Sequence, residues 1–100
     1  MNLEIREGIY KKAISTWGET AQYEMAQEES TELALAVRKH IRKNDDHSYS
    51  NLVEEIADVE IMIEQIKMMN RQYGIEKEIE FQKLEKLHRL NDRLDKKQFN

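Results

Sequence analysis

Apolar residues recur every three or four positions along nearly the whole chain, and no proline interrupts them. This period is that of one face of an α-helix, whereas a proline inside the pattern would kink or end the helix. Only three of the 100 residues are glycine. The sequence therefore predicts an all-α fold, in which four helices form a bundle.

The predicted helices are bounded by residues that favour turns and caps. Gly18 offers a break, Ser48 or Ser50 can cap the third helix, and Gly74 suits a left-handed stop. The helices are expected over Leu3 to about Thr16, Glu19 to Lys43, Tyr49 to Tyr73 and Ile75 to Lys97. No repeat or linker divides the chain, so residues 1–100 are expected to form a single domain.

Composition excludes several classes of protein. The chain has no cysteine, which removes disulfides and thiolate sites, and its net charge of -4 argues against a surface for nucleic acid. No apolar run approaches the roughly 20 residues that span a bilayer, and no signal peptide is visible at the N-terminus. We therefore expect a cytoplasmic protein with no membrane partner.

Acidic residues interrupt the apolar stripe of the second predicted helix. The stretch EESTE covers residues 28–32, and helical geometry places Glu29 and Glu32 inside the stripe and Glu28 on its border. A second stretch, EEIAD, covers residues 54–58, where Glu55 and Asp58 flank the apolar stripe of the third helix. Each pair has i, i+3 spacing, so its two carboxylates rise from one side of a helix.

A short connection favours antiparallel packing of the second and third helices, which would bring four carboxylates to one level. Like charges at the edge of an apolar core repel one another and have lost hydration. No basic residue lies between the members of either pair. A divalent cation is therefore expected, and Mg²⁺ prefers carboxylate oxygens. Either cluster alone could be an ordinary solvated acidic face.

These residues resemble the signature of the MazG-like nucleotide pyrophosphohydrolases, of the all-α nucleoside triphosphate pyrophosphatase superfamily. The family's motifs are EExxE followed by ExxD, which match residues 28–32 and 55–58, and the resemblance extends over about residues 17–69. It implies a MazG-like helical domain, hydrolysis of nucleoside triphosphates between the α and β phosphates, and assembly into homodimers or homotetramers.

The resemblance also implies roles for individual residues. Mg²⁺, or Mn²⁺ in its place, would be bound by Glu29, Glu32, Glu55 and Asp58, with Glu28 as an outer-sphere acid and the role of Glu54 open. Which acid serves as the general base stays open. No Ser-His-Asp or Cys-His arrangement is evident in the sequence.

Other residues are candidates for substrate binding, each with a simpler alternative. Trp17 could stack on the base or fill the core, and Gln22 and Tyr23 could line the base pocket. Lys83 could bind the departing phosphates or pair with Glu80 on the helix surface. Two groups are expected to be structural: the surface histidines His40, His47 and His88, and the core or interface methionines Met62, Met68 and Met69.

Two other functions remain open. Phosphoribosyl-ATP pyrophosphohydrolase of histidine biosynthesis belongs to the same superfamily, but this chain reads YEMAQ before EESTE and lacks the glycine and lysine expected there. The chain could also be a helical interaction module without catalysis.

The looser apolar stripe of the fourth helix favours packing on a second subunit.

Overall fold

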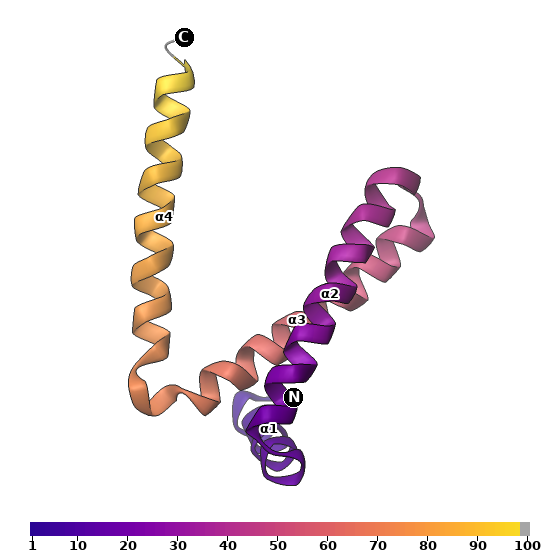
Figure 1. Cartoon of the computed structure of the whole chain (residues 1–100), viewed down its shortest axis with the longest axis vertical. Helices are drawn as coiled ribbons and strands as arrows, with labels where there is room; N and C mark the ends of the chain where they lie inside the picture. Colours follow the sequence, from indigo (N-terminus) through magenta and orange to yellow (C-terminus); the bar gives the residue numbers. More distant parts are fainter. Residues whose placement is uncertain (99–100) are drawn as a thin grey trace. The chain divides into compact units, whose positions relative to one another are not determined.

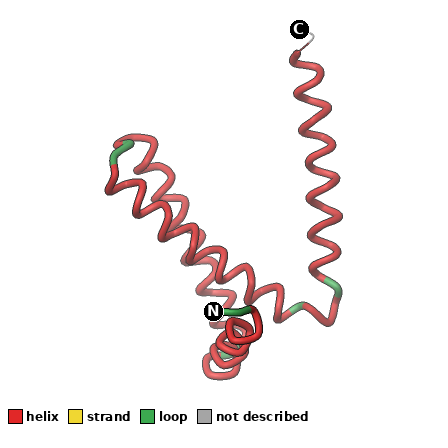
Figure 2. Tube along the Cα trace, turned by 180° about the vertical axis from the view of Figure 1, so that it is seen from behind, coloured by secondary structure: helices red, strands yellow, loops and turns green. Residues whose placement is uncertain are grey.

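All the regular structure in the computed structural model, which describes residues 1–98, is helical (Figure 1). Short loops join the helices, and no strand occurs among the described residues (Figure 2). The all-α prediction is thus confirmed. The helices are α1 (Leu3–Trp17), α2 (Glu19–Lys43), α3 (Asp46–Met69), the short 3-10 helix η1 (Arg71–Tyr73) and α4 (Ile75–Gln98).

The chain divides into two compact units, one of Met1–Met69 and one that begins at Asn70. The first unit contains α1, α2 and α3, and the second contains η1 and α4. Every buried residue of the described part lies in the first unit: Tyr10, Gln22, Ala36, Ser48, Met62 and Gln65. Half of this small core is polar, which is the feature that bears most on function.

Helix α1 begins and ends where the sequence supplies caps. The side chain of Asn2 accepts a hydrogen bond from the backbone N–H of Ile5 at 2.8 Å, which satisfies one of the free donors of the first turn. The helix stops at Gly18, whose φ of 90° is unfavourable for any residue with a Cβ. The break predicted at Gly18 is confirmed.

Helices α2 and α3 pack side by side and antiparallel, joined by two residues (Figure 1). Asn44 ends α2 in the left-handed conformation, and the carboxylate of Asp45 accepts a hydrogen bond from the backbone N–H of Ser48 at 2.8 Å. Asp45 therefore caps α3, which starts at Asp46. The predicted start at Tyr49, with Ser48 or Ser50 as the cap, is wrong because a nearer Asp already supplies the acceptor.

Ser48 is fully buried beneath this connection. Its hydroxyl oxygen lies 2.9 Å from Nδ1 of His40 and accepts a hydrogen bond from the backbone N–H of Asp45 at 3.1 Å. The ring of His40 also lies against that of Tyr49, with centroids 6.1 Å apart. His40 is thus half-buried and ties the end of α2 to the start of α3, so its assignment to the surface is wrong.

Helix α3 ends at Met69, and the predicted continuation to Tyr73 is a separate turn of 3-10 helix. Gly74 follows it with φ 73° and donates its backbone N–H to the carbonyl of Arg71 at 3.0 Å. The left-handed stop at Gly74 is confirmed, although it closes η1 and not α3 itself.

The face that α3 turns towards α2 differs from the aliphatic stripe seen in its sequence. Ser48 and Met62 are buried and Glu55 is half-buried, whereas Ile56 and Ile63 remain 40% and 45% exposed. The helical period groups residues by face, but the packing against α2 selects the neighbouring face, which carries Glu55. The expectation that Glu55 only flanks the packed stripe is therefore wrong, and Met62 is confirmed as a core residue.

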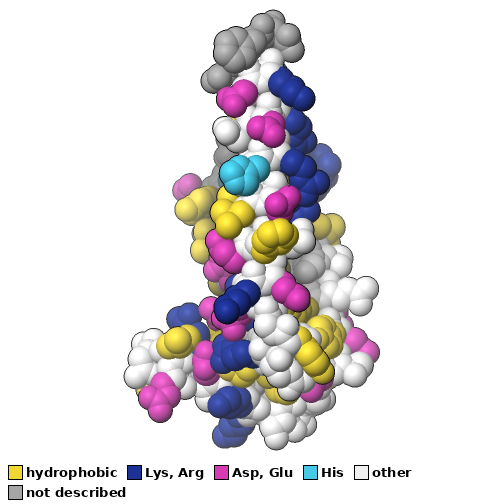
Figure 3. Space-filling model, turned by 90° about the vertical axis from the view of Figure 1, so that its left-hand side faces the viewer, with side chains coloured by type: hydrophobic (Ala, Val, Ile, Leu, Met, Phe, Trp, Pro, Cys, Tyr) yellow, Lys and Arg dark blue, Asp and Glu magenta, His cyan; other side chains and the backbone are white. Residues whose placement is uncertain are grey.

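Helix α4 carries two stripes of different character. Its leucines and Phe81 are 43% to 61% exposed, and no described residue of the helix is buried. Lys and Arg side chains gather along one edge of α4 (Figure 3). A shallow hollow on this helix is lined by Lys86, Arg89, Arg93 and Lys96 together with Asp92. No helix within residues 1–98 is long and apolar enough to cross a membrane.

Candidate metal centre

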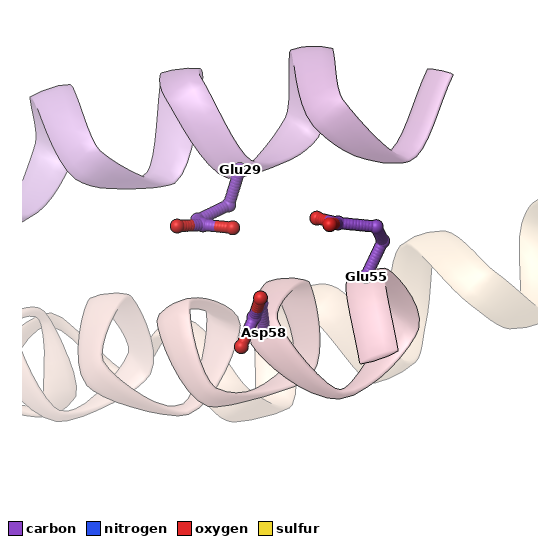
Figure 4. A group of neighbouring side chains, drawn as sticks. All are labelled: Glu29, Glu55 and Asp58. Carbon is purple, nitrogen blue, oxygen red and sulfur yellow. The ribbon is translucent and has the colours of Figure 1, made fainter. Parts of the chain in front are cut away.

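Three carboxylates from two helices point towards one another in the first unit. Glu29 projects from α2, and Glu55 and Asp58 project from α3 to meet it (Figure 4). Each offers one oxygen atom, and these three oxygens all lie within 4.8 Å of one another. The convergence predicted for Glu29, Glu55 and Asp58 is confirmed as a geometric arrangement.

The antiparallel packing of α2 and α3 explains this arrangement. Glu55 and Asp58 are three residues apart, so they lie one turn apart on the same side of α3. Glu29 occupies the face of α2 that also carries the buried Gln22 and Ala36, seven residues before and after it. Seven residues are close to two helical turns, so all three α2 side chains face α3.

The carboxylates interact strongly enough to change their proton affinity. Loss of water through burial raises the pKa of Glu29 above its ordinary value, and the nearby charges of Asp58 and Glu55 raise this pKa further. A hydrogen bond between the carboxyl groups of Glu29 and Asp58 acts in the same direction. Burial likewise raises the pKa of Glu55, followed by the charges of Asp58 and Glu32. The fully ionised cluster therefore opposes folding unless a cation compensates it.

One oxygen of this cluster has no partner within the protein. Oε2 of Glu55 is buried and makes no hydrogen bond among the described residues. A buried carboxylate oxygen without a partner is costly, because it has given up hydration for nothing in return. Three close carboxylates with an unsatisfied oxygen are a suitable ligand set for a hard divalent cation.

The remaining acids of the two motifs lie around this group. Glu32 is exposed and does not belong to the set of three, but its charge contributes to the raised pKa of Glu29 and Glu55. Glu28 and Glu54 are exposed on the outer sides of α2 and α3. The structure thus brings together three of the four predicted ligands, with Glu32 at the margin.

The substrate-binding candidates lie on three different helices, α1, α2 and α4. Trp17 is 66% exposed at the end of α1, which excludes the alternative of a core residue within the described chain. Tyr23 is 41% exposed, whereas Gln22 is only 2% exposed and faces α3. Lys83 lies exposed on α4, in the second unit.

Two polar groups of the first unit were not anticipated from the sequence. Tyr10 donates its hydroxyl hydrogen to Glu64 across the contact between α1 and α3, and Arg6 forms an ion pair with the same carboxylate at 3.4 Å. Burial, and then the hydrogen bond to Glu64, raise the pKa of Tyr10 to about 12. The other polar group is the amide of Gln65, a residue that is only 5% exposed. Long-range pairs such as Tyr10 and Glu64 have no sequence signal, whereas Gln65 lies seven residues after Asp58, on nearly the same face of α3.

No protein family, curated protein or solved structure matches the chain. Its function is therefore inferred from its residues and their arrangement.

Proposed function

We propose that the protein is a Mg²⁺-dependent nucleoside triphosphate pyrophosphohydrolase of the MazG-like kind, which releases pyrophosphate and leaves a nucleoside monophosphate. One arrangement carries this proposal: one oxygen each of Glu29, Glu55 and Asp58 lies within 4.8 Å of the others, and Oε2 of Glu55 is buried without a partner among the described residues. The spacing of these acids, as EExxE and ExxD, supports the assignment.

In this proposal the acids of the two motifs bind the metal ion. Glu29, Glu55 and Asp58 hold the ion, and Glu32, whose exposed side chain is free to rotate, completes the set. When bound, Mg²⁺ would neutralise charge on the phosphates and lower the pKa of a bound water. The rigid α2–α3 pair keeps the carboxylates in register, so little ordering is left to be done when substrate arrives.

Assembly into a homodimer or homotetramer belongs to the same proposal. Large apolar side chains are exposed on each of the four α-helices, among them Ile9, Ile41, Ile63 and Leu87 at 45% to 66% exposure. Large apolar side chains exposed on a small protein favour association. A second subunit would cover part of this surface and border the nucleotide. Light scattering together with activity at nanomolar concentration would test this, and a fully active monomer would contradict it.

The proposal is tested with a panel of ribonucleotides and deoxyribonucleotides assayed for pyrophosphate release, with Mg²⁺, with Mn²⁺ and with chelator. We expect turnover of at least one triphosphate with metal and none with chelator. Metal should also raise the melting temperature, because it binds only the folded cluster. A Glu24→Gln variant, which changes an exposed acid of α2 outside the cluster, is the matched control and should behave as the parent.

Equal melting curves with and without metal, and no turnover of any triphosphate, would contradict the proposal and favour a helical interaction module. Phosphoribosyl-ATP is included in the panel, because preferential cleavage of that compound would assign the chain to the related enzyme of histidine biosynthesis.

A further inference from the structure

Two buried amides lie on the same faces of α2 and α3 as the carboxylates. Gln22 precedes Glu29 by seven residues and Gln65 follows Asp58 by seven, and seven residues return a helix to nearly the same face. Since α2 and α3 run antiparallel, both steps lead the same way along the pair. The two amides therefore lie at one level, about 10 Å from the carboxylates at 1.5 Å per residue.

Both amides are buried and incompletely satisfied. Gln22 is 2% exposed and its Nε2 has no partner, and Gln65 is 5% exposed and its Oε1 has none. Gln65 Nε2 contacts only the thioether of Met62 at 3.7 Å, which is a weak acceptor. One level of the helix pair thus presents a free donor and a free acceptor, where apolar side chains of similar size would be more stable.

A hollow in the first unit adjoins this level. It measures about 450 Å³, lies between α1 and α3, and includes Gln65 in its lining. This volume falls within the range of small-molecule sites, roughly 300–1,000 Å³. Most of its wall is apolar and is formed by Ile9, Tyr10, Ala13, Ala57 and Ile61, while Arg6, Glu60 and Glu64 add charged groups to the lining. Such walls suit a flat ring, with the amide supplying the polar contact that fixes its orientation.

We propose that Gln65 recognises the hydrogen-bonding edge of the nucleobase of the substrate, while the ring occupies the hollow between α1 and α3 that Gln65 lines. Gln22 does not line this hollow and would act by positioning Gln65 from the facing helix. The inference rests on the proposed function, since it needs phosphates at Glu29, Glu55 and Asp58. The separation of the two levels is comparable with the reach of a nucleoside from its α phosphate to the far edge of its base. Every base carries a hydrogen-bond donor on this edge, from which the free Oε1 of Gln65 could accept.

The alternative is that the two amides hydrogen-bond to each other after a small rotation and only stabilise the helix pair. The two roles predict different results for methionine variants, which keep the length of the side chain and remove its polarity. A base-reading role predicts a loss of discrimination with little loss of stability, because Gln22 Nε2 and Gln65 Oε1 have no partner in the free protein and Gln65 Nε2 has only the weak contact with Met62. Mutual pairing predicts a loss of stability with no change in discrimination.

The test compares the parent with Gln65→Met and Gln22→Met, using the four common nucleoside triphosphates and ribose 5-triphosphate, which has no base. We expect the parent to prefer its best nucleotide over ribose 5-triphosphate by about tenfold or more in kcat/KM. Gln65→Met should reduce this preference by about tenfold and Gln22→Met by less, with kcat/KM for ribose 5-triphosphate nearly unchanged. Gln27→Met, at an exposed position of α2, is the matched control and should leave the preference intact.

The outcomes separate the two proposals. If the parent releases no pyrophosphate from any triphosphate, the proposed function fails and the inference fails with it. If the parent is active but both variants keep its base preference, only the inference is overturned. Should a methionine variant not fold, the parent alone decides, since equal kcat/KM for nucleotides and ribose 5-triphosphate would overturn the inference.

Discussion

Buried polar groups at the two ends of the α2–α3 pair are treated in opposite ways. Beside the connection, Ser48 is fully buried and hydrogen-bonds to both His40 and Asp45. Further along the pair, atoms of Glu55, Gln22 and Gln65 are buried with no partner. A polar group that serves the fold is normally satisfied within it, because an unsatisfied one costs about 1–3 kcal/mol. The part of the helix pair that contains these unsatisfied groups, both the carboxylates and the two amides, is therefore where an external ligand is expected.

The largest expected effect comes from removing one negative charge from the cluster of carboxylates. Glu55→Gln or Asp58→Asn should lower pyrophosphate release by several orders of magnitude, because a hard anionic ligand is lost. The metal-free variant should be as stable as the parent or more so at neutral pH, since the repulsion that raises the pKa of Glu29 and Glu55 is relieved. Turnover assays and thermal melts in chelator measure the two quantities.

A variant that keeps near-parental turnover would remove the acidic cluster from the mechanism. A variant that is clearly less stable without metal would mean that these acids stabilise the fold, as Ser48 does. The proposed difference between Ser48 and the acidic cluster would then be wrong.

The satisfied level should respond in the opposite sense. Ser48→Ala removes the hydroxyl that bonds to His40 and Asp45, so we expect a loss of about 1–3 kcal/mol in the free energy of unfolding. Turnover per folded molecule should stay within about twofold of the parent, since additivity holds for distant sites. Denaturant unfolding and active-site-normalised kinetics give the two numbers.

Ser50→Ala, at an exposed position two residues further along α3, is the matched control for Ser48→Ala and should change stability by less than about 0.5 kcal/mol. Equal losses in the two alanine variants would show that the buried network contributes nothing specific.

The smallest expected effect concerns Tyr10, a satisfied group at the contact of α1 with α3. Tyr10→Phe should cost about 1 kcal/mol at neutral pH, because one hydrogen bond to Glu64 is lost. The pKa of Tyr10 is raised from 10.0 to about 12, so the neutral phenol is favoured in the folded state. Its contribution is complete below pH 10 and is lost as the pH rises through 12. The stability difference between parent and variant should therefore shrink over that window, and a constant difference would argue against the hydrogen bond.

Much of the acidic centre was predictable from spacing alone. The i, i+3 pairs and the short connection were enough to predict that Glu29 meets Glu55 and Asp58, because two residues between the helices favour antiparallel packing. The depth of each acid was not predictable. Glu32 is exposed although helical geometry places it in the apolar stripe of α2, and Ile56 is exposed although it belongs to the aliphatic stripe of α3. Asp58, which flanks that stripe by sequence, is exposed as well.

The reason is that periodicity identifies the residues that share a face but not the partner that covers that face. Several apolar faces of this chain, such as the one with Ile56 and Ile63, stay largely exposed in the structure of the described residues. The prediction of the N-cap of α3 was wrong for a different reason. Asp45 and Ser48 are both residue types that favour the N-cap, and only the backbone geometry determines which of them occupies it. The contact of Tyr10 with Glu64 joins residues 54 positions apart, which no local pattern records.

The connection between α2 and α3 also has a consequence for the order in which the molecule forms. Only Asn44 and Asp45 separate the helices, so the first contacts across the pair, such as His40 with Ser48, close a very short loop. Contacts of small sequence separation form early and allow fast folding. We expect the helical hairpin to form before α1 docks, so that the carboxylates already meet in the transition state. Mg²⁺ should then speed refolding in stopped-flow experiments, whereas a site completed late would only slow unfolding.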